Sequence, residues 1–506
     1  MGRHHTGLLK TLAFGTAAGL ATLTTAHAAD LPVKAKAIEY VKICTAYGAG
    51  FYYIPGTDTC IRIGGAIRVG TTFNGNPWDV PFFQGGAGGA GSYNRNYYAT
   101  RERAYLNVDT RTATEYGVVR TYASLLFDFS QGRESIAGGY IENDFLFIQF
   151  AGFTFGKAVS EFDPQWALSK PIIGTTTGAL SGSHNDTGIP QLAYTAEFGN
   201  GVSATLSLED AQPYRSAGVV NTSLGGSNAL LGPFGGATTS YGAVANTFQG
   251  NAQGGDHVPD VVANLRLDQA WGSLHVGAAA HEVHGTYYTP TDSDTGHPSA
   301  TWGYAVIGAF ELKNLPTGTG DSLKVQASFA NGAAKYVFGG AYDSSGAGRF
   351  ARIGDGGMGF GYVLDGVYGN GTSIQKSDAW QAAAFYEHYW NPAWRTSLFG
   401  SYSRISYGAT GDALLLAAAN GGRLSTGVTN ATGSFALSLA EVGTRTAWTP
   451  VKDLTFAAEF SYVRMMQNLN GTFTTTSAFQ GIAVGNTFQL KNQNLYQGAV
   501  EVRRNF

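Results

Sequence analysis

The chain has 506 residues, and only 13% of them are Asp, Glu, Lys or Arg, about half the share usual in a soluble domain. Its 32 basic and 35 acidic residues leave a formal net charge of −3, which lacks the basic footprint of nucleic-acid binding, so we expect no nucleic-acid partner. Glycine supplies 71 residues, roughly twice average usage, and low charge with many glycines and aromatic residues favours a large β-structure with lipid outside and long loops.

Residues 1–28 have the pattern of a secretory signal peptide. Arg3 and Lys10 form a basic start, an interrupted apolar stretch runs from Leu12 to Leu23, and small residues precede a cleavage site before Ala29. A transmembrane helix is the alternative, but the stretch is short and carries Thr and Gly. Cleavage would leave 30 basic and 35 acidic residues, a formal charge of −5. No later window approaches the roughly 20 apolar residues of a spanning helix, so a membrane protein with this sequence must be a closed β-barrel.

Residues 29–59 are expected to form an N-terminal periplasmic segment that precedes a barrel at 60–506. Within it, residues 33–43 have a short helical pattern, which fits either a packed extension or a plug at the barrel mouth. Cys44 and Cys60 are the two cysteines, and in an exported protein we expect them to form a disulfide. A loop of that size stabilises by about 3 kcal/mol. A reactive or metal-binding thiol pair is the alternative, although neither His nor C-x-x-C accompanies them.

Sixteen runs of alternating apolar and polar residues predict β-strands joined in turn by short turns and long segments. The strands are 60–73, 97–111, 116–129, 142–150, 153–157, 190–198, 202–209, 260–269, 273–284, 302–312, 322–330, 380–390, 394–405, 437–448, 454–464 and 495–506. The long segments are 74–96, 130–141, 158–189, 210–259, 285–301, 332–378, 407–436 and 466–494. Long loops on one rim and short turns on the other are typical of an all-β, transmembrane antiparallel barrel. A count of fourteen or eighteen strands stays open.

Six of the eight tryptophans lie at predicted strand ends, where aromatic girdles meet lipid headgroups. They are Trp271, Trp390, Trp394 and Trp448 beside short turns, and Trp302 and Trp380 at the other end. The last strand ends at Phe506 with one apolar and one charged face, so it needs a partner strand. Pairing with the first strand, 60–73, would close the barrel.

Lumen-facing side chains decide what passes through a barrel. The first three strands place six arginines on their polar face: Arg62, Arg68, Arg101, Arg103, Arg111 and Arg120. The segment 158–189 after Lys157 is rich in apolar residues for a loop, which predicts that it packs inside the barrel. Lys157 would begin this constriction, and Glu161 and Asp163, with Asp186 further along, would face the arginines across a narrow passage. Such opposed charges give a strong transverse field.

Two stretches carry a resemblance to a known family. The sequence YGAGFYYIPGTDTC from Tyr47 to Cys60, followed by IRIGG, is similar to the N-terminal signature of the alphaproteobacterial general porins. The stretch FIQFAGFTFGK from Phe147 to Lys157 resembles the one ahead of their third loop. Where that family has Arg after the last Gly, this chain has Lys157, which keeps the charge and loses the planar fork. The similarity is good at both ends and over the first third of the chain.

The resemblance implies a sixteen-stranded, trimeric pore in the Gram-negative outer membrane, with its third loop folded into the lumen. It implies passive diffusion of small hydrophilic solutes and ions, contact with outer-membrane lipid and lipopolysaccharide, and recognition of Phe506 by the outer-membrane assembly machinery. A substrate-selective channel and a secreted β-rich adhesin are the rival hypotheses. A substrate-specific transporter or barrel enzyme would need a large plug domain or a catalytic trio, and the sequence reveals neither.

Three short motifs are interpreted as chance matches. The stretch from Gly354 to Gly359 fits G-x-G-x-x-G, but we expect no strand before it and no helix after it. His281 and His284 miss the H-E-x-x-H spacing, so no zinc site is predicted. Asp292 to Gly296 hints at a calcium loop without its distal Glu, which leaves a weak exposed cation site as the alternative. No catalytic arrangement can be argued from spacing, so we expect neither an enzyme nor a cofactor.

Overall fold

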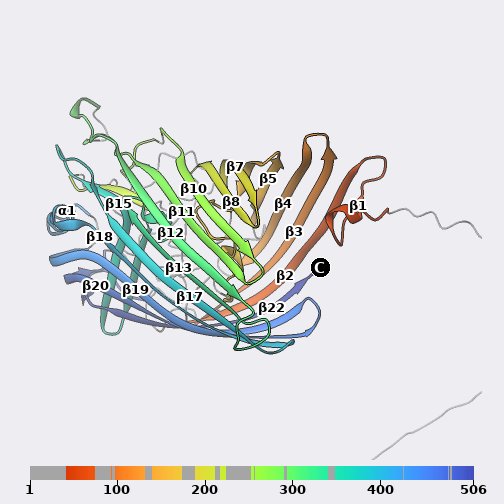
Figure 1. Ribbon diagram of the computed structural model, residues 1–506. Coiled ribbons are helices and arrows are strands. Elements are labelled where there is room, and N and C mark those ends of the chain that lie inside the picture. Colours follow the sequence, from red (N-terminus) through yellow and green to blue (C-terminus); the bar gives the residue numbers. More distant parts are fainter. Residues whose placement is uncertain are drawn as a thin grey trace, which may run out of the picture.

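The computed structural model describes residues 42–74, 93, 97–130, 140–173, 188–210, 217–223, 252–255, 257–289, 293–339, 348–424, 427–476, 478 and 481–506. In these residues, sixteen long strands form one antiparallel sheet that closes into a barrel (Figure 1). In ring order they are β2 (Thr59–Phe73), β3 (Tyr98–Thr114), β4 (Gly117–Ser130), β5 (Tyr140–Phe150), β6 (Phe153–Ala158), β7 (Ile189–Gly199), β8 (Val202–Glu209), β10 (Asp260–Gln269), β11 (Gly272–Val283), β12 (Thr301–Lys313), β13 (Ser322–Asn331), β17 (Asp378–Asn391), β18 (Trp394–Ser406), β19 (Val428–Val451), β20 (Leu454–Thr474) and β22 (Gln493–Asn505).

Closure is made by β22, which pairs with β20 on one side and with β2 on the other. Val502 lies opposite Val69 in this last pairing, so the strand predicted to need a partner has the partner that was expected. A closed sheet leaves no exposed edge for aggregation. The sixteen-strand prediction is therefore confirmed.

The tight turns follow from residues that tolerate a positive φ. Gly199, Asn200 and Gly201 join β7 to β8 with φ of 82°, 50° and 75°. A Cβ at Gly201 would lie 1.9 Å from the carbonyl oxygen of Asp268, so only glycine fits there. Turns of this kind form one end of the barrel, which we call the short-turn rim. The opposite end is the long-loop rim.

Two strands reach well beyond their predicted ranges. β19 has 24 residues and β20 has 21, and their pairing continues to Val428 opposite Phe473. The register shifts between Thr429 and Thr432 and again between Gly433 and Leu437. Such bulges interrupt the alternation of apolar and polar residues, which is why the sequence pattern stopped short.

The outer face of the barrel carries the apolar side chains. All six tryptophans predicted at strand ends are exposed on this surface, and Trp394 stacks on Trp448 with ring centroids 5.6 Å apart. This agrees with the predicted girdles. Among the described residues, no helix has the length and apolar character that crossing a membrane would require.

Before β2, the chain forms η1 (Thr45–Tyr47) and the short strand β1 (Tyr52–Tyr53), which pairs with the start of β2. The predicted disulfide between Cys44 and Cys60 is present, with the two Cα atoms 6.0 Å apart. The predicted signal peptide 1–28 and all but the last two residues of the helical stretch 33–43 lie outside the described residues.

The long loops contain structure that the sequence did not predict. A small sheet of β9 (Gly218–Asn221), β14 (Gly348–Gly354), β15 (Gly357–Tyr368) and β16 (Gln375–Lys376) forms a layer separate from the barrel sheet. Beside it lie η8 (Ala334–Tyr336) and the helix α1 (Gly408–Asn420). Smaller elements are η3 (Ala167–Ser169), η7 (Ser293–Thr295) and β21 (Thr487–Gln489). The segments 332–378 and 407–436 are thus not simple loops.

Candidate functional site in the barrel lumen

The segment after β6 follows the inner wall of the barrel. We call its described part, residues 159–173, the inner loop. The amine of Lys324 on β13 donates to the carbonyl of Ser169 at 3.1 Å, and the hydroxyl of Ser397 on β18 donates to that of Pro171 at 2.6 Å. The guanidinium of Arg68 on β2 donates to the carbonyl of Ile173 at 2.7 Å. The inner loop therefore lies inside the barrel, as predicted for the third loop.

The start of the inner loop is anchored on β8 and β10. The Ser160 hydroxyl and the Glu161 main-chain N–H donate to the Glu209 carboxylate at 2.7 and 2.8 Å. The Glu161 carboxylate accepts hydrogen bonds from Arg266 and Asn264, both at 2.9 Å. Its partner is therefore Arg266 on β10, a residue outside the predicted site, and not one of the six predicted arginines.

Asp163 is also placed differently from the prediction. Its residue is only 1% exposed, so it is packed against the wall instead of facing an open passage. Burial lowers the pKa of the neighbouring Lys170 to about 8, while the charge of Asp163 opposes that change. The inner loop therefore packs closely on the barrel wall, with Asp163 buried in that contact and Glu161 paired with Arg266.

The six predicted arginines are gathered on one sector of the lumen, as expected. Arg111 lies opposite Arg120, and Arg68 lies opposite Arg103, on neighbouring strands. In the described residues they are held by three carboxylates, one of which, Asp128, is 2.7 Å from Arg101. The pairs are Asp109 with Arg62, Arg111 and Arg120, Asp128 with Arg101 and Arg103, and Glu501 with Arg68. We call this sector of β2 to β4 the arginine wall.

Three further predicted residues lie away from this wall. Lys157 alternates in step with the exposed Phe155 and lies opposite the exposed Leu146, so it belongs to the outer face and not to the constriction. Its amine donates to the carbonyl of Asn143. Asp186 lies outside the described residues. Phe506 is exposed at the short-turn rim, next to β2.

The described residues 332–339 and 348–377 fill the long-loop half of the lumen, and we call them the plug. All twelve residues of β15 are buried. At one end, the main-chain N–H of Asn494 on β22 donates to Asp355 at 2.8 Å. At the other, His281 Nε2 on β11 lies 3.5 Å from the Asp365 carboxylate. β11 and β22 are seven strands apart in the ring of sixteen, so the plug spans almost the full width of the barrel.

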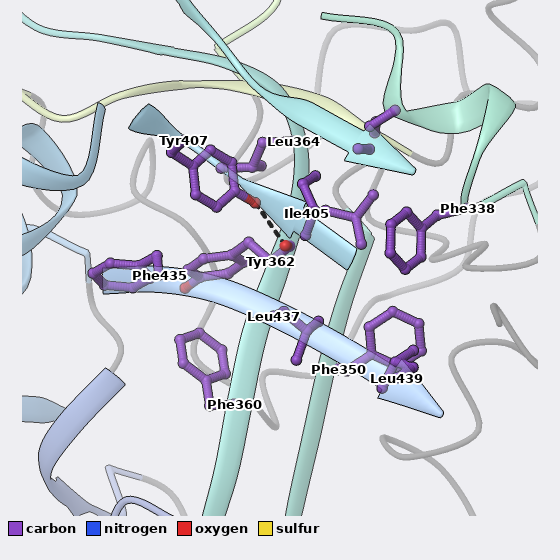
Figure 2. Packing of buried hydrophobic residues seen from close by; sticks show 14 of the residues in the cluster. Phe338, Phe350, Phe360, Tyr362, Leu364, Ile405, Tyr407, Phe435, Leu437 and Leu439 are labelled. Carbon is purple, nitrogen blue, oxygen red and sulfur yellow. Dashed lines mark hydrogen bonds between the residues drawn. The ribbon is translucent and has the colours of Figure 1, made fainter. Parts of the chain in front are cut away.

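The plug packs on the wall through apolar side chains. Figure 2 shows Phe360 and Tyr362 of β15 beside Leu437 of β19 and Phe435. The Tyr407 hydroxyl donates to the carbonyl of Tyr362 at 2.6 Å, and burial raises the pKa of Tyr407 well above its usual value. Each fully buried side chain of this size contributes about 1.5–3 kcal/mol. Withdrawing several together would cost on the order of 10 kcal/mol, which favours the packed position of the plug.

A carboxylate on the opposite side of the barrel from the arginine wall, that of Asp260, makes ionic contacts with the plug. Asp260 on β10 accepts a hydrogen bond from the Tyr336 hydroxyl at 2.6 Å and lies 2.9 Å from the Lys335 amine. His281, from the H-E-V-H stretch, contacts the other oxygen of Asp260 at 2.7 Å. All four groups are buried, so the pairing compensates charges that would otherwise be costly there.

The sequence contains a signal for the hairpin of the plug. Asp355 and Gly356 have φ of 53° and 68°, and they form the two-residue turn between β14 and β15. Asp-Gly between apolar alternating runs is a strong hairpin signal. The G-x-G-x-x-G match at 354–359 therefore marks a hairpin with a strand before it, contrary to the expectation of a loop without one.

Comparison with known proteins agrees with this geometry. The family model described as "Porin subfamily" matches residues 30–499. Porin Omp2b of Brucella suis biovar 1 and that of Brucella melitensis biotype 1 are each 31% identical over 283 residues. The match covers 54% of this chain and 66% of each relative, so the chain spans a little under two thirds of their length.

A solved structure has the same architecture. The outer membrane channel DcaP of Acinetobacter baumannii aligns over 90% of this chain and 99% of that one, with a TM-score of 0.56 and 13% sequence identity. At that identity the likeness concerns the fold. Together with the family match over most of the chain, it leads to one conclusion: the chain belongs to the porin subfamily and is a multi-pass β-barrel of the outer membrane.

Proposed function

We propose that the protein forms a water-filled channel for passive diffusion of small hydrophilic solutes and ions. The observation that carries this proposal is the arginine wall, a charged sector on the inner face of a closed barrel whose outer face is apolar. Charge inside and apolar side chains outside are what a lipid-embedded pore requires. Membership of the porin subfamily indicates a channel rather than an enzyme.

The constriction is proposed where the inner loop meets the arginine wall. The bond from Arg68 to the carbonyl of Ile173 joins the two. Glu161 and Asp163 lie earlier on the same loop, and their charges act on this passage through a low-dielectric interior. A contribution from Asp186 remains a prediction, since it lies outside the described residues.

Planar-bilayer recording tests the proposal. The purified protein is expected to give stepwise, ohmic conductance in potassium chloride without added substrate. A matched preparation unfolded by boiling should give none. Folded protein that inserts and does not conduct would contradict the proposal.

A substrate-selective outer-membrane channel is the second candidate, and the plug favours it. An apolar body spanning the barrel leaves less open area than a porin with free long loops. Liposome swelling with sugars of increasing size separates the two candidates. A steep cutoff, with one solute class passing much faster than others of equal size, favours selectivity, whereas a smooth dependence on size favours general diffusion.

Assembly and export complete the proposal. We propose removal of residues 1–28, a homotrimer in contact with outer-membrane lipid and lipopolysaccharide, and recognition of Phe506 by the assembly machinery. The exposed apolar outer face supports the lipid contact. The disulfide between Cys44 and Cys60 is consistent with folding outside the cytoplasm. We propose that the short-turn rim faces the periplasm.

A further inference from the structure

The N-terminal segment forms a small tethered hairpin at the short-turn rim. The disulfide joins Cys44 to Cys60 on β2, and the main-chain N–H of Cys44 donates to the carbonyl of Phe51 at 2.9 Å. Tyr52 of β1 pairs with Ile61 of β2, next to the disulfide. Phe51 is buried between the two cysteines as a result. The tether therefore gives the Phe51 ring a defined position on the inner side of β2.

The Phe51 ring lies between two arginines. The guanidinium carbon of Arg62 is 5.1 Å from the ring centroid, and that of Arg111 is 5.0 Å from it. Tyr47, from the same hairpin, lies 5.6 Å from Arg111. These are cation–π distances, so the hairpin orients both guanidinium groups without neutralising either of them.

The charge of this cluster is incompletely balanced. Arg111 and Arg120 each bind Asp109 through two nitrogens at 3.1–3.3 Å. Arg62 comes only to 3.9 Å from Asp109, beyond hydrogen-bond distance, and its side chain is 48% exposed. Three arginines thus share the carboxylate of Asp109, and the Arg62 side chain is the most exposed of the three.

A cavity of about 340 Å³ opens beside this arginine. Arg62, Asp109 and Tyr122 contribute to its lining, and it reaches Phe506 at the end of the chain. The volume is sufficient for an anion of a few heavy atoms with part of its hydration. A guanidinium on the wall matches the planar oxygens of carboxylates and phosphates.

We propose that this cavity is a binding site for a small oxyanion, a carboxylate or phosphate, with Arg62 as its ligand and Phe51 as the positioning residue. The inference rests on the proposed channel function, because the site lies where solutes would enter or leave at the short-turn rim. It differs from the constriction, where Arg68 is already bonded to Glu501 and Ile173.

The test is block of chloride current by inorganic phosphate added on the short-turn side. In Arg62→Gln the half-blocking concentration should rise about tenfold, the loss expected for a charged hydrogen bond. Arg504→Gln is the matched control, because Arg504 lies at the same rim on the outer register and donates to the carbonyl of Lys452. An equal half-blocking concentration in wild type and Arg62→Gln overturns the site.

The positioning role is tested separately with Phe51→Leu, which keeps apolar volume and removes the aromatic ring. Block should weaken about threefold, with a similar loss in the double variant Cys44→Ser, Cys60→Ser. Tyr116→Ala, an exposed aromatic at a short turn, is the control. Retention of full block in Phe51→Leu overturns the positioning role. Heat-modifiable migration confirms that each variant is folded.

A readout independent of conduction separates the two proposals. Line broadening of inorganic phosphate in phosphorus NMR reports binding to the detergent-folded barrel, whether or not it conducts. Broadening that Arg62→Gln removes supports the site even if no current is seen. Current without such broadening leaves the channel proposal intact and overturns the anion site. Acetate in place of phosphate distinguishes the carboxylate from the phosphate preference.

Discussion

Phe506 and Gly65 exchange two main-chain hydrogen bonds, each 3.0 Å long, where the last strand of the barrel meets the first. A Cβ on Gly65 would lie 2.9 Å from the Phe506 ring and 2.1 Å from the Tyr105 carbonyl oxygen. The Phe506 ring therefore packs over Gly65, where a residue with a Cβ would clash. The final residue of the chain takes part in closing the sheet, in addition to any signal that it carries.

Replacing Phe506 with Ser should reduce the yield of assembled protein more than it changes conductance. The two main-chain bonds can still form, whereas the apolar cover over Gly65 is lost. Heat-modifiable migration of membrane extracts measures the yield, and bilayer recording measures the conductance of the assembled fraction. Normal yield with altered conductance would be the opposite of the expected result.

Removing the plug should increase conductance several-fold, because it spans the barrel. The ends of the segment lie together, since the main-chain N–H of Gly332 donates to the carbonyl of Ser377 at 2.8 Å. A short glycine linker can therefore replace residues 334–375. Leu437→Ser and Leu439→Ser in the same variant keep the newly exposed wall polar. Unchanged conductance would show that the plug does not limit the passage.

Locking the plug in place should leave conductance unchanged, because its apolar packing already holds it there. An added Cβ at Gly359 would lie 3.4 Å from the Cβ of Gln493, near the roughly 3.8 Å typical of a disulfide. The variant Gly359→Cys, Gln493→Cys is recorded before and after reduction. The parent protein, which carries only Cys44–Cys60, receives the same reductant as a control. Loss of current on oxidation, restored by reduction, would mean that the plug has to move.

Neutralising Glu161 and Asp163 should shift ion selectivity toward anions. Glu161→Gln leaves Arg266 without its carboxylate, now paired at 2.9 Å, so we expect this change to dominate. The reversal potential under a salt gradient is the measurement. Asp453→Asn, an exposed acid in the short turn between β19 and β20, is the comparison. An unchanged reversal potential in the double variant would exclude this loop from control of selectivity.

Asp321, in the turn between β12 and β13, should make stability depend on pH. Burial favours its neutral form, but hydrogen bonds from Thr317, His388 and the main chain of Tyr389 outweigh burial and hold its pKa well below 3.8. A lowered pKa means that its contribution is full above pH 3.8 and is lost as the pH falls toward the folded-state pKa.

Asp321→Asn should therefore cost about 1–3 kcal/mol near neutral pH, because the donors that surround it lose an acceptor. Urea unfolding in detergent at neutral and at acidic pH gives the free energy of unfolding of each protein at each pH. The difference between wild type and variant should shrink on acidification below pH 3.8. Asp378→Asn, an exposed acid at the other rim, is the control. A difference that stays constant with pH would argue against this account of Asp321.

Much of the barrel was predictable, because strands are local patterns. Alternation places Arg62 and Arg68 on the same face whatever the rest of the chain does. The pairing of Cys44 with Cys60 needed only two cysteines and an exported chain. The prediction for Lys157 is wrong because it groups this residue with the loop that follows, whereas alternation with Phe155 places it on the outer face. The plug was missed because its hairpin signal at Asp355–Gly356 lay in a segment treated as a loop.

By itself, the amino-acid sequence determined the strand positions, the short turns, the apolar outer face and the arginine side of the lumen, since each depends on residues within a few positions of one another. Tertiary structure alone decided which charges meet. Glu161 is bound by Arg266 and Asp260 by Lys335, through contacts between distant segments. It also decided that the plug enters the barrel, because β15 finds its apolar partners only on strands that closure brings around it.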